Sequence, residues 1–126
     1  MNTLRLSATL ALVLASTNAG AGDFSGTFLC SVTRFGGHSY AKVGDKSIVA
    51  VSTLLSPRIG YIYAGGSGNY ANDCEETGSL VNCDTPGSMV RRIIFDTSTL
   101  VLTQPFGFEN AFTESQCKPL DIDALP

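Results

Sequence analysis

Residues 89–104, Met-Val-Arg-Arg-Ile-Ile-Phe-Asp-Thr-Ser-Thr-Leu-Val-Leu-Thr-Gln, decide the fold class of this chain. Both halves of the stretch are rich in β-branched and large apolar residues, which favour strands, and Asp96-Thr97-Ser98 between them is typical of a turn. The stretch therefore predicts a β-hairpin. Four large apolar side chains recur at period two along its arms and would share one face: Ile93, Phe95, Leu100 and Leu102.

A two-stranded hairpin is at best marginally stable in water, so its apolar face needs further strands to cover it. Residues 24–33, 47–55 and 58–64 are rich in β-branched and aromatic residues, and each run is followed by Gly or Pro. Residues 106–112 offer a last short strand. Helical periodicity is absent, so the chain predicts an all-β fold, a small antiparallel sandwich or barrel of about six to eight short strands with two disulfides.

The strand-like runs also predict which side chains are buried. Phe24, Phe28, Cys30 and Val32 share one parity and would face the core together. Gly60, inside the third run, marks a bulge.

The N-terminus has the three parts of a secretory signal peptide. Residues 1–5 end in the positive Arg5, an apolar run without charge follows, and small residues allow cleavage after Ala19 or Ala21. The apolar run is much shorter than the roughly 20 residues of a membrane-spanning helix, so we expect no membrane span. The sequence thus predicts a signal peptide over residues 1–21 and export to the periplasm or the outside of the cell.

The remaining chain has the length of a single domain. We expect this domain to span residues 22–117. Residues 118–126 contain two prolines and little to anchor them, which predicts a disordered tail.

All four cysteines follow the signal peptide, and an even number in an exported chain predicts two disulfides. Four cysteines allow three pairings. We predict Cys74 with Cys83, which closes a short polar loop, and Cys30 with Cys117, which ties the first strand to the end of the last. Zinc binding is not indicated, because the chain lacks CxxC spacing and has only one histidine.

The charge of the chain limits its partners. Without Arg5, seven Lys and Arg remain against eleven Asp and Glu, a net charge of about −4. Nucleic acid is not an expected partner, because the only adjacent bases, Arg91 and Arg92, would point to opposite sides of a strand. A charge of this size keeps a small domain soluble and would favour a basic protein partner.

The candidate catalytic residues do not form a recognisable site. A hydrolase would use His38 as base for one of the serines, but the mature chain has no G-x-S-x-G elbow. Glu75 and Glu76 lack an apolar pocket that would raise one pKa for glycoside cleavage, and with Asp73 and Asp84 they lack the spacing of a calcium loop. We therefore expect no catalytic residue, no metal and no cofactor.

The segment between Gly65 and Cys83 is the best candidate for a binding site. Its glycine-rich start and polar remainder predict a surface loop closed by a disulfide. Residues 65–70, Gly-Gly-Ser-Gly-Asn-Tyr, resemble the Ser-Gly-x-x-Tyr loop of periplasmic inhibitors of c-type lysozyme, small exported β-barrels whose loop enters the lysozyme cleft. The match has one spacer residue fewer, and the chain has no Trp. The candidate binding residues are Ser67, Asn69 and Tyr70.

The sequence thus predicts a small exported domain that binds a ligand or protein partner, or lends structure, and is not an enzyme. One alternative is an inhibitor of a secreted hydrolase such as lysozyme, acting through residues 65–83. A second alternative is a small hydrolase that uses His38.

Overall fold

A computed structural model describes residues 23–38, 40–63, 68–71, 73–85, 90–108 and 110–120. The regular elements in these ranges are all β-strands, which confirms the predicted all-β class. The strands are β1 Ser25–Gly36, β2 Lys46–Ser52, β3 Arg58–Tyr63, β4 Gly68–Ala71, β5 Cys74–Thr77, β6 Leu80–Asp84, β7 Arg92–Asp96, β8 Val101–Pro105 and β9 Phe112–Pro119. The predicted signal peptide lies outside the described residues.

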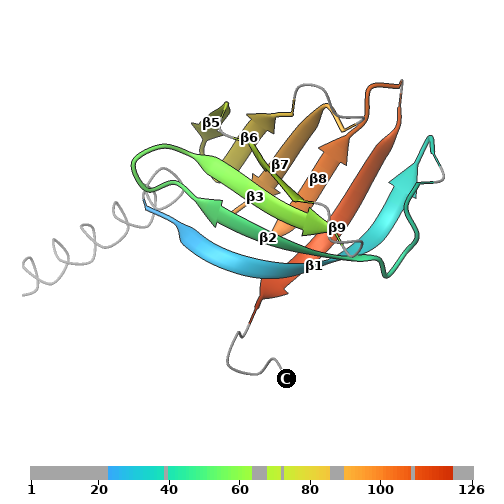
Figure 1. The fold of residues 1–126 in the computed structure, drawn as a ribbon, viewed down its shortest axis with the longest axis horizontal. Coiled ribbons are helices and arrows are strands. Elements are labelled where there is room, and N and C mark those ends of the chain that lie inside the picture. The colour runs from blue at the N-terminus through green and yellow to red at the C-terminus, as the bar shows by residue number, and fades with distance from the viewer. Residues whose placement is uncertain are drawn as a thin grey trace, which may run out of the picture.

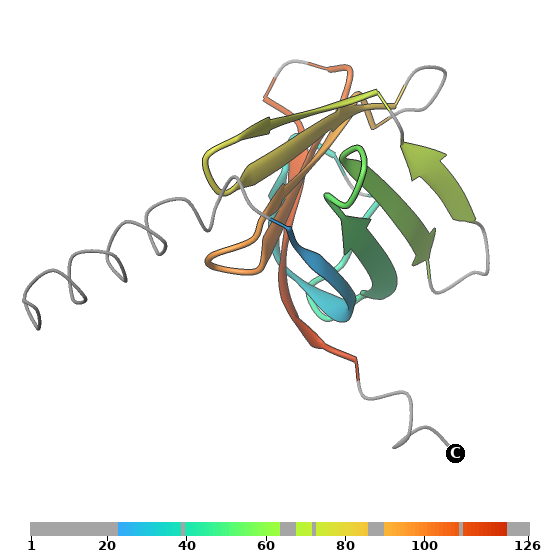
Figure 2. The same ribbon diagram turned by 90° about the vertical axis from the view of Figure 1, so that its left-hand side faces the viewer.

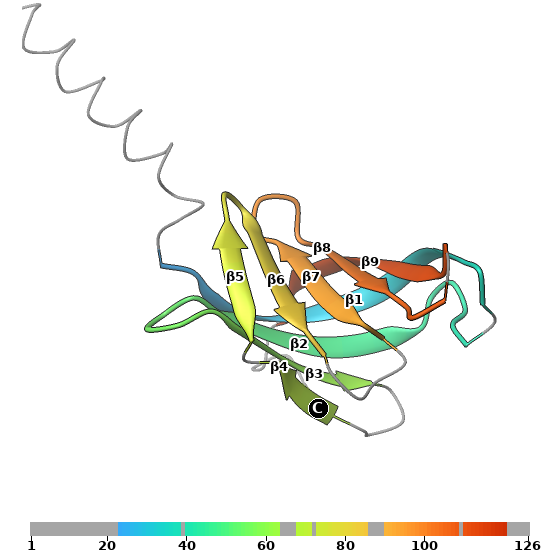
Figure 3. The same ribbon diagram turned by 90° about the horizontal axis from the view of Figure 1, so that it is seen from above.

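The strands form one antiparallel sheet in the order β4-β3-β2-β1-β9-β8-β7-β6-β5. Apart from β4 and β5, strands that follow one another along the chain pair with one another, and the first strand also pairs with the last. Figures 1 and 3 show that the sheet curls, so that β1, β2 and β3 face the wall made by β6, β7 and β8. The result is an up-and-down meander closed through β1 and β9.

The two edge strands of the sheet, β4 and β5, are joined by residues 72 and 73 alone. Because neighbouring strands alternate in direction around the sheet, β4 and β5 run the same way. They therefore act as one long strand whose first half pairs with β3 and whose second half pairs with β6. This shared strand brings the two edges together and nearly closes the sheet into a barrel, as the side view in Figure 2 shows.

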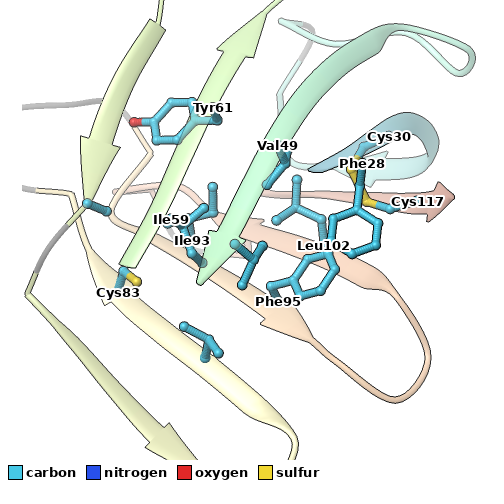
Figure 4. Packing of buried hydrophobic residues seen from close by; sticks show 13 residues of the cluster. Phe28, Cys30, Val49, Ile59, Tyr61, Cys83, Ile93, Phe95, Leu102 and Cys117 are labelled. Atoms are coloured by element: carbon cyan, nitrogen blue, oxygen red, sulfur yellow. A yellow bond between two sulfur atoms is a disulfide. The ribbon is translucent and has the colours of Figure 1, made fainter. Parts of the chain in front are cut away.

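The core fills one half of the barrel. Phe28 from β1 and Phe95 from β7 have ring centroids 5.0 Å apart, and Leu102 of β8 lies beside them. Ile59 from β3 and Ile93 from the opposite wall belong to the same buried cluster (Figure 4). The predicted inward parity of β1 is confirmed, because Phe28, Cys30 and Val32 are buried and Phe24 packs on the core.

The predicted hairpin is present as β7 and β8, with Phe95 opposite Leu102. Ile93, Phe95 and Leu102 are fully buried, as expected for three of the four residues on the predicted face. The fourth, Leu100, lies in the turn at a positive φ of 59° and packs on the core from there.

Asp96 organises the turn of this hairpin. Its Oδ1 accepts hydrogen bonds from the Ser98 backbone N–H at 2.9 Å, the Ser98 hydroxyl at 2.7 Å and the Thr99 N–H at 3.3 Å. Partial burial tends to raise the pKa of the Asp96 carboxyl, but hydrogen bonds from Ser98, Ser79 and Thr99 outweigh burial and leave the pKa below its usual value. The folded turn therefore favours the carboxylate form.

Asp96→Ala should lower the free energy of unfolding at pH 7 by about 1 to 2 kcal/mol, because it removes the acceptor for these donors. Since the folded pKa is depressed, this contribution is present above the unfolded pKa of about 4 and is lost as the pH falls through the folded value. Urea unfolding of both proteins from pH 7 to pH 2 measures the difference. A difference that stays constant across this range would contradict the assignment.

Wild type and Asp96→Ala must be compared because the pKa of a second carboxyl, that of Glu114, is also lowered in the folded protein. The pKa of Glu114 is lowered, first by its hydrogen bonds from Arg34 and then, against the opposing effect of burial, by the Arg34 charge. Wild type and Asp96→Ala share this pair, so their difference isolates Asp96.

Both predicted disulfides are present. Cys30 of β1 lies directly opposite Cys117 of β9, and Cys74 of β5 lies opposite Cys83 of β6. The first disulfide therefore fastens the pair of strands that closes the meander, and the second fastens the edge hairpin. Two disulfides indicate an oxidising, extracellular environment.

Several local predictions were wrong. Residues 65–83 do not form one surface loop, because they contain β4, β5 and most of β6. Gly60 is not a bulge, since it pairs in register with Ala50. The register shift instead falls at Thr33, between Val32 and Arg34 of β1.

The end of the chain also differs from the sequence prediction. The last strand begins at Phe112, where the predicted strand over residues 106–112 was to end, and continues to Pro119. Leu120 donates its backbone N–H to the Thr27 carbonyl at 2.9 Å, so the first residues of the predicted tail belong to the fold. Residues 121–126 lie outside the described residues.

Candidate functional site at the barrel mouth

One end of the barrel carries its longer connections. Because neighbouring strands are antiparallel, the connections that follow β1, β3, β6 and β8 all leave at the same end. We call this end the mouth. Three of the connections at the mouth, residues 37–45, 85–91 and 106–111, are longer than those at the other end, residues 53–57, 78–79 and 97–100. Ligand sites in β-barrels commonly lie at such a mouth.

A pocket of about 300 Å³ opens at the mouth. Val32 of β1, Ala41 of the β1–β2 connection and Val90 line its apolar side. The rings of Tyr40 and Phe106 stand at its rim with centroids 6.2 Å apart and planes within 5° of parallel. A volume of this size is at the lower end of the range for small-molecule sites.

The barrel wall inside the pocket is polar. Gln104 of β8 is 6% exposed, and Thr113 and Ser115 of β9 are 5% and 3% exposed. Gln104 and Thr113 are directly opposite one another, and Ser115 is the next inward residue on β9. The interior thus changes from an apolar core to a wall of uncharged hydrogen-bonding groups. Groups of this kind orient a ligand. Apolar side chains would fill the same space at a lower desolvation cost.

Two of the residues that line the pocket, Lys46 and Asp45, are charged, and each bonds to a neighbour. Lys46 donates from Nζ to the hydroxyl of Ser31, which lies on the outer face of β1, at 2.9 Å. Asp45 accepts the Lys42 backbone N–H on Oδ2 at 2.9 Å and so closes the turn of the β1–β2 connection. Lys46 and Asp45 are exposed to solvent. The other residues that line the pocket, including its buried polar wall, are uncharged.

His38 anchors the β1–β2 connection over the mouth. Its Nδ1 accepts the Tyr40 backbone N–H at 3.1 Å, which places the ring proton on Nε2. Nε2 lies 2.9 Å from the Phe112 carbonyl oxygen and 3.0 Å from Thr113 Oγ1. The ring also stacks on Phe106 with centroids 4.1 Å apart.

This geometry does not suit His38 for general-base chemistry. With the proton on Nε2 and Nδ1 occupied by a backbone donor, the ring has no free acceptor for the proton of a nucleophile. Among the described residues no carboxylate hydrogen-bonds to the ring, so no triad is assembled. The arrangement favours an anchoring role for His38.

Gly37 holds the same connection in place by its lack of a side chain. Its φ is +73°, and a Cβ here would lie 2.7 Å from the Cα of Ala111 in the β8–β9 connection. The two connections therefore pack directly on each other at the mouth.

The candidate binding residues from the sequence fall only partly within the described structure. Ser67 lies outside the described residues. Asn69 and Tyr70 belong to β4, where their backbones pair with Tyr61 and Gly60 of β3. The connection from β3 to β4 leaves the barrel at the mouth end, like the pocket.

The carboxylates that were weighed as a site are dispersed. Glu75 and Glu76 point to opposite sides of β5, and Asp84 forms an ion pair with Arg92 at 3.5 Å. Within the described part of the chain, no group of three or more His, Cys, Asp or Glu is placed to hold a metal ion. The same part contains no helix of the length and apolarity that a membrane span requires.

The polar wall of the pocket was not predicted from the sequence. The signal was present, because Gln104 shares the inward parity of Leu102, and Thr113 and Ser115 share that of Cys117. Polar residues on the buried parity of a strand need hydrogen-bond partners, which an apolar core does not supply.

Comparisons of the chain with protein-family models, with curated proteins and with solved structures find no match.

Proposed function

We propose that this protein is an exported, non-enzymatic binding domain that holds a small molecule in the pocket at the barrel mouth. The observation that carries the proposal is the buried polar wall of Gln104, Thr113 and Ser115 facing a pocket of about 300 Å³. The two disulfides and the predicted signal peptide support export to the periplasm or the outside of the cell.

A larger depression of about 580 Å³ beside Arg91, Arg92 and Asp84 is a less suitable site. These three residues are exposed, and the charges of Arg92 and Asp84 are paired with each other. A ligand there would remain largely in water, whereas the mouth pocket has a buried wall formed by Gln104, Thr113 and Ser115.

Binding at the mouth can be measured by titrating ¹⁵N-labelled mature protein with four small molecules, indole, cyclohexanol, benzoate and benzylamine. We expect at least one of them to shift the backbone amide resonances of Val32, Thr113 and Ser115. If none of the four shifts these amides at millimolar concentration, the proposal fails.

A matched pair of variants locates the binding. Ala41→Phe adds a large ring to a residue that lines the pocket and should abolish the shifts. Ala50→Phe adds the same ring on the exposed outer face of β2 and should leave them unchanged. Equal shifts in both variants would place the binding elsewhere.

Inhibition of a secreted hydrolase is the second candidate function. It is favoured by the resemblance of residues 65–70 to the loop of c-type lysozyme inhibitors and by the mouth-end position of the β3–β4 connection. The net negative charge would also attract basic lysozyme.

An excess of the protein should then inhibit c-type lysozyme, and Ser67→Ala or Tyr70→Ala should abolish inhibition without a large change in melting temperature. Turbidity of a bacterial cell-wall suspension gives the lysozyme activity. Full lysozyme activity at a large excess of the protein would exclude this enzyme as the target.

A further inference from the structure

The chemistry of the mouth pocket narrows the class of its ligand, an inference that rests on the proposed binding function. Four properties of the pocket bear on this class: its charge, its polar wall, its rim and its volume. Each of them is set by described residues.

The charge of the ligand follows from the uncharged buried wall. Lys46 and Asp45, the charged residues at the pocket, are exposed, and their side chains are engaged with Ser31 and with the Lys42 backbone. A charged ligand group moved from water against the buried wall would lose hydration, and Gln104, Thr113 and Ser115 offer it no opposite charge. The pocket therefore disfavours both anions and cations.

The polar wall calls for at least one hydrogen-bonding group on the ligand. Gln104 offers a carboxamide, which both donates and accepts, and Thr113 and Ser115 offer hydroxyls. Gln104 and Thr113 are paired across β8 and β9, so their side chains share one patch of the wall. A ligand with a polar atom can add hydrogen bonds to these groups that an apolar ligand cannot make.

The rim and the volume indicate a flat ring. Tyr40 and Phe106 present nearly parallel rings, a surface on which another ring can stack. A liquid water molecule occupies about 30 Å³, so 300 Å³ corresponds to about ten non-hydrogen atoms. One aromatic ring with a small substituent, or two fused rings, has this size.

We propose that the pocket binds an uncharged aromatic molecule of about ten non-hydrogen atoms that carries one N–H or O–H group. The ring lies between the rim and the apolar side formed by Val32 and Val90, and the polar group reaches Gln104, Thr113 or Ser115 on the wall.

Calorimetric titration of the mature protein with four compounds of similar size tests this class. Indole is uncharged and carries an N–H; indane has a similar fused-ring shape without it; benzoate and benzylamine carry opposite charges. We expect indole to bind about ten-fold more tightly than indane, the effect of one net hydrogen bond, and at least about ten-fold more tightly than either charged compound.

Gln104→Met, which keeps the length of the side chain but removes its amide, should reduce the preference for indole over indane. The Ala50→Phe protein serves as control and should keep the wild-type preference. A loss in Gln104→Met of binding by both compounds, with a lowered melting temperature, would report misfolding, and Thr113→Val then tests the same wall from β9.

The outcomes separate the ligand class from the pocket itself. Benzoate or benzylamine binding as tightly as indole at the mouth would overturn the uncharged class while leaving the pocket function intact. Indane binding as tightly as indole would overturn the role of the polar wall. Absence of binding by all four compounds and by cyclohexanol would overturn both this inference and the proposed function.

Discussion

Replacing Phe95 with Ala is expected to lower the free energy of unfolding by about 3 to 5 kcal/mol, because the change removes a fully buried ring and leaves a cavity. The ring lies 5.0 Å from that of Phe28 and 6.1 Å from that of Phe24, measured between centroids. Both partners come from the N-terminal part of the chain, so Phe95 joins the two walls of the barrel. Urea unfolding monitored by circular dichroism measures the loss.

Phe108→Ala is the matched control for this prediction. Phe108 is 44% exposed at the mouth, so the same truncation there should cost less than about 1 kcal/mol. Equal losses in the two variants would show that the core does not lie where the structure places it. A loss as large as that of Phe95→Ala can unfold a domain whose total stability is about 5 to 15 kcal/mol.

Removal of the Cys30–Cys117 disulfide is expected to destabilise the protein by about 4 to 5 kcal/mol on the chain-entropy relation, because its cysteines are 87 positions apart. Removal of Cys74–Cys83, with a separation of 9, should cost about 3 kcal/mol. The double variants Cys30→Ala/Cys117→Ala and Cys74→Ala/Cys83→Ala, compared by urea unfolding, give the two values.

The informative result is which of the two double variants loses more free energy of unfolding. The long-range disulfide fastens β1 to β9, the pair that closes the meander, whereas the short one fastens a hairpin that turn geometry already favours. A larger loss for Cys74–Cys83 would show that the edge strand β5, rather than the β1–β9 closure, limits the stability of the barrel.

The strands that could be predicted are those in which large apolar residues occur at every second position. The period-two pattern of Ile93, Phe95 and Leu102 predicted β7 and β8. The same pattern of Phe28, Cys30 and Val32 predicted β1. The disulfide pairing was predicted from the positions of the cysteines, because Cys74 and Cys83 close a short segment and Cys30 and Cys117 lie near the two ends of the domain.

Two of the three strands that were missed, β4 and β5, lack this signal. Residues 74–77, Cys-Glu-Glu-Thr, contain no large apolar side chain, yet they form β5 because they pair with β6 and are fastened to it by a disulfide. Residues 68–71 are rich in small and polar residues and pair with β3 as β4. Both strands form because they pair with other strands, and the propensity of their own residues is a weak guide in such positions.

The pocket could not be predicted for a related reason. Its apolar side, rim and polar wall come from β1, the β1–β2 connection, β8 and β9, segments that only the closed meander brings together. The sequence had directed attention to residues 65–70 and gave no sign that His38 would anchor a connection rather than act as a base.

The most direct test of the central claim, that the barrel mouth is a ligand site, is the set of intermolecular nuclear Overhauser effects in the complex with indole. We expect contacts from indole ring protons to the methyl groups of Val32 and Val90, which line the pocket. Contacts instead to the methyl groups of Ile48 and Ile62, exposed on the outer faces of β2 and β3, would contradict it.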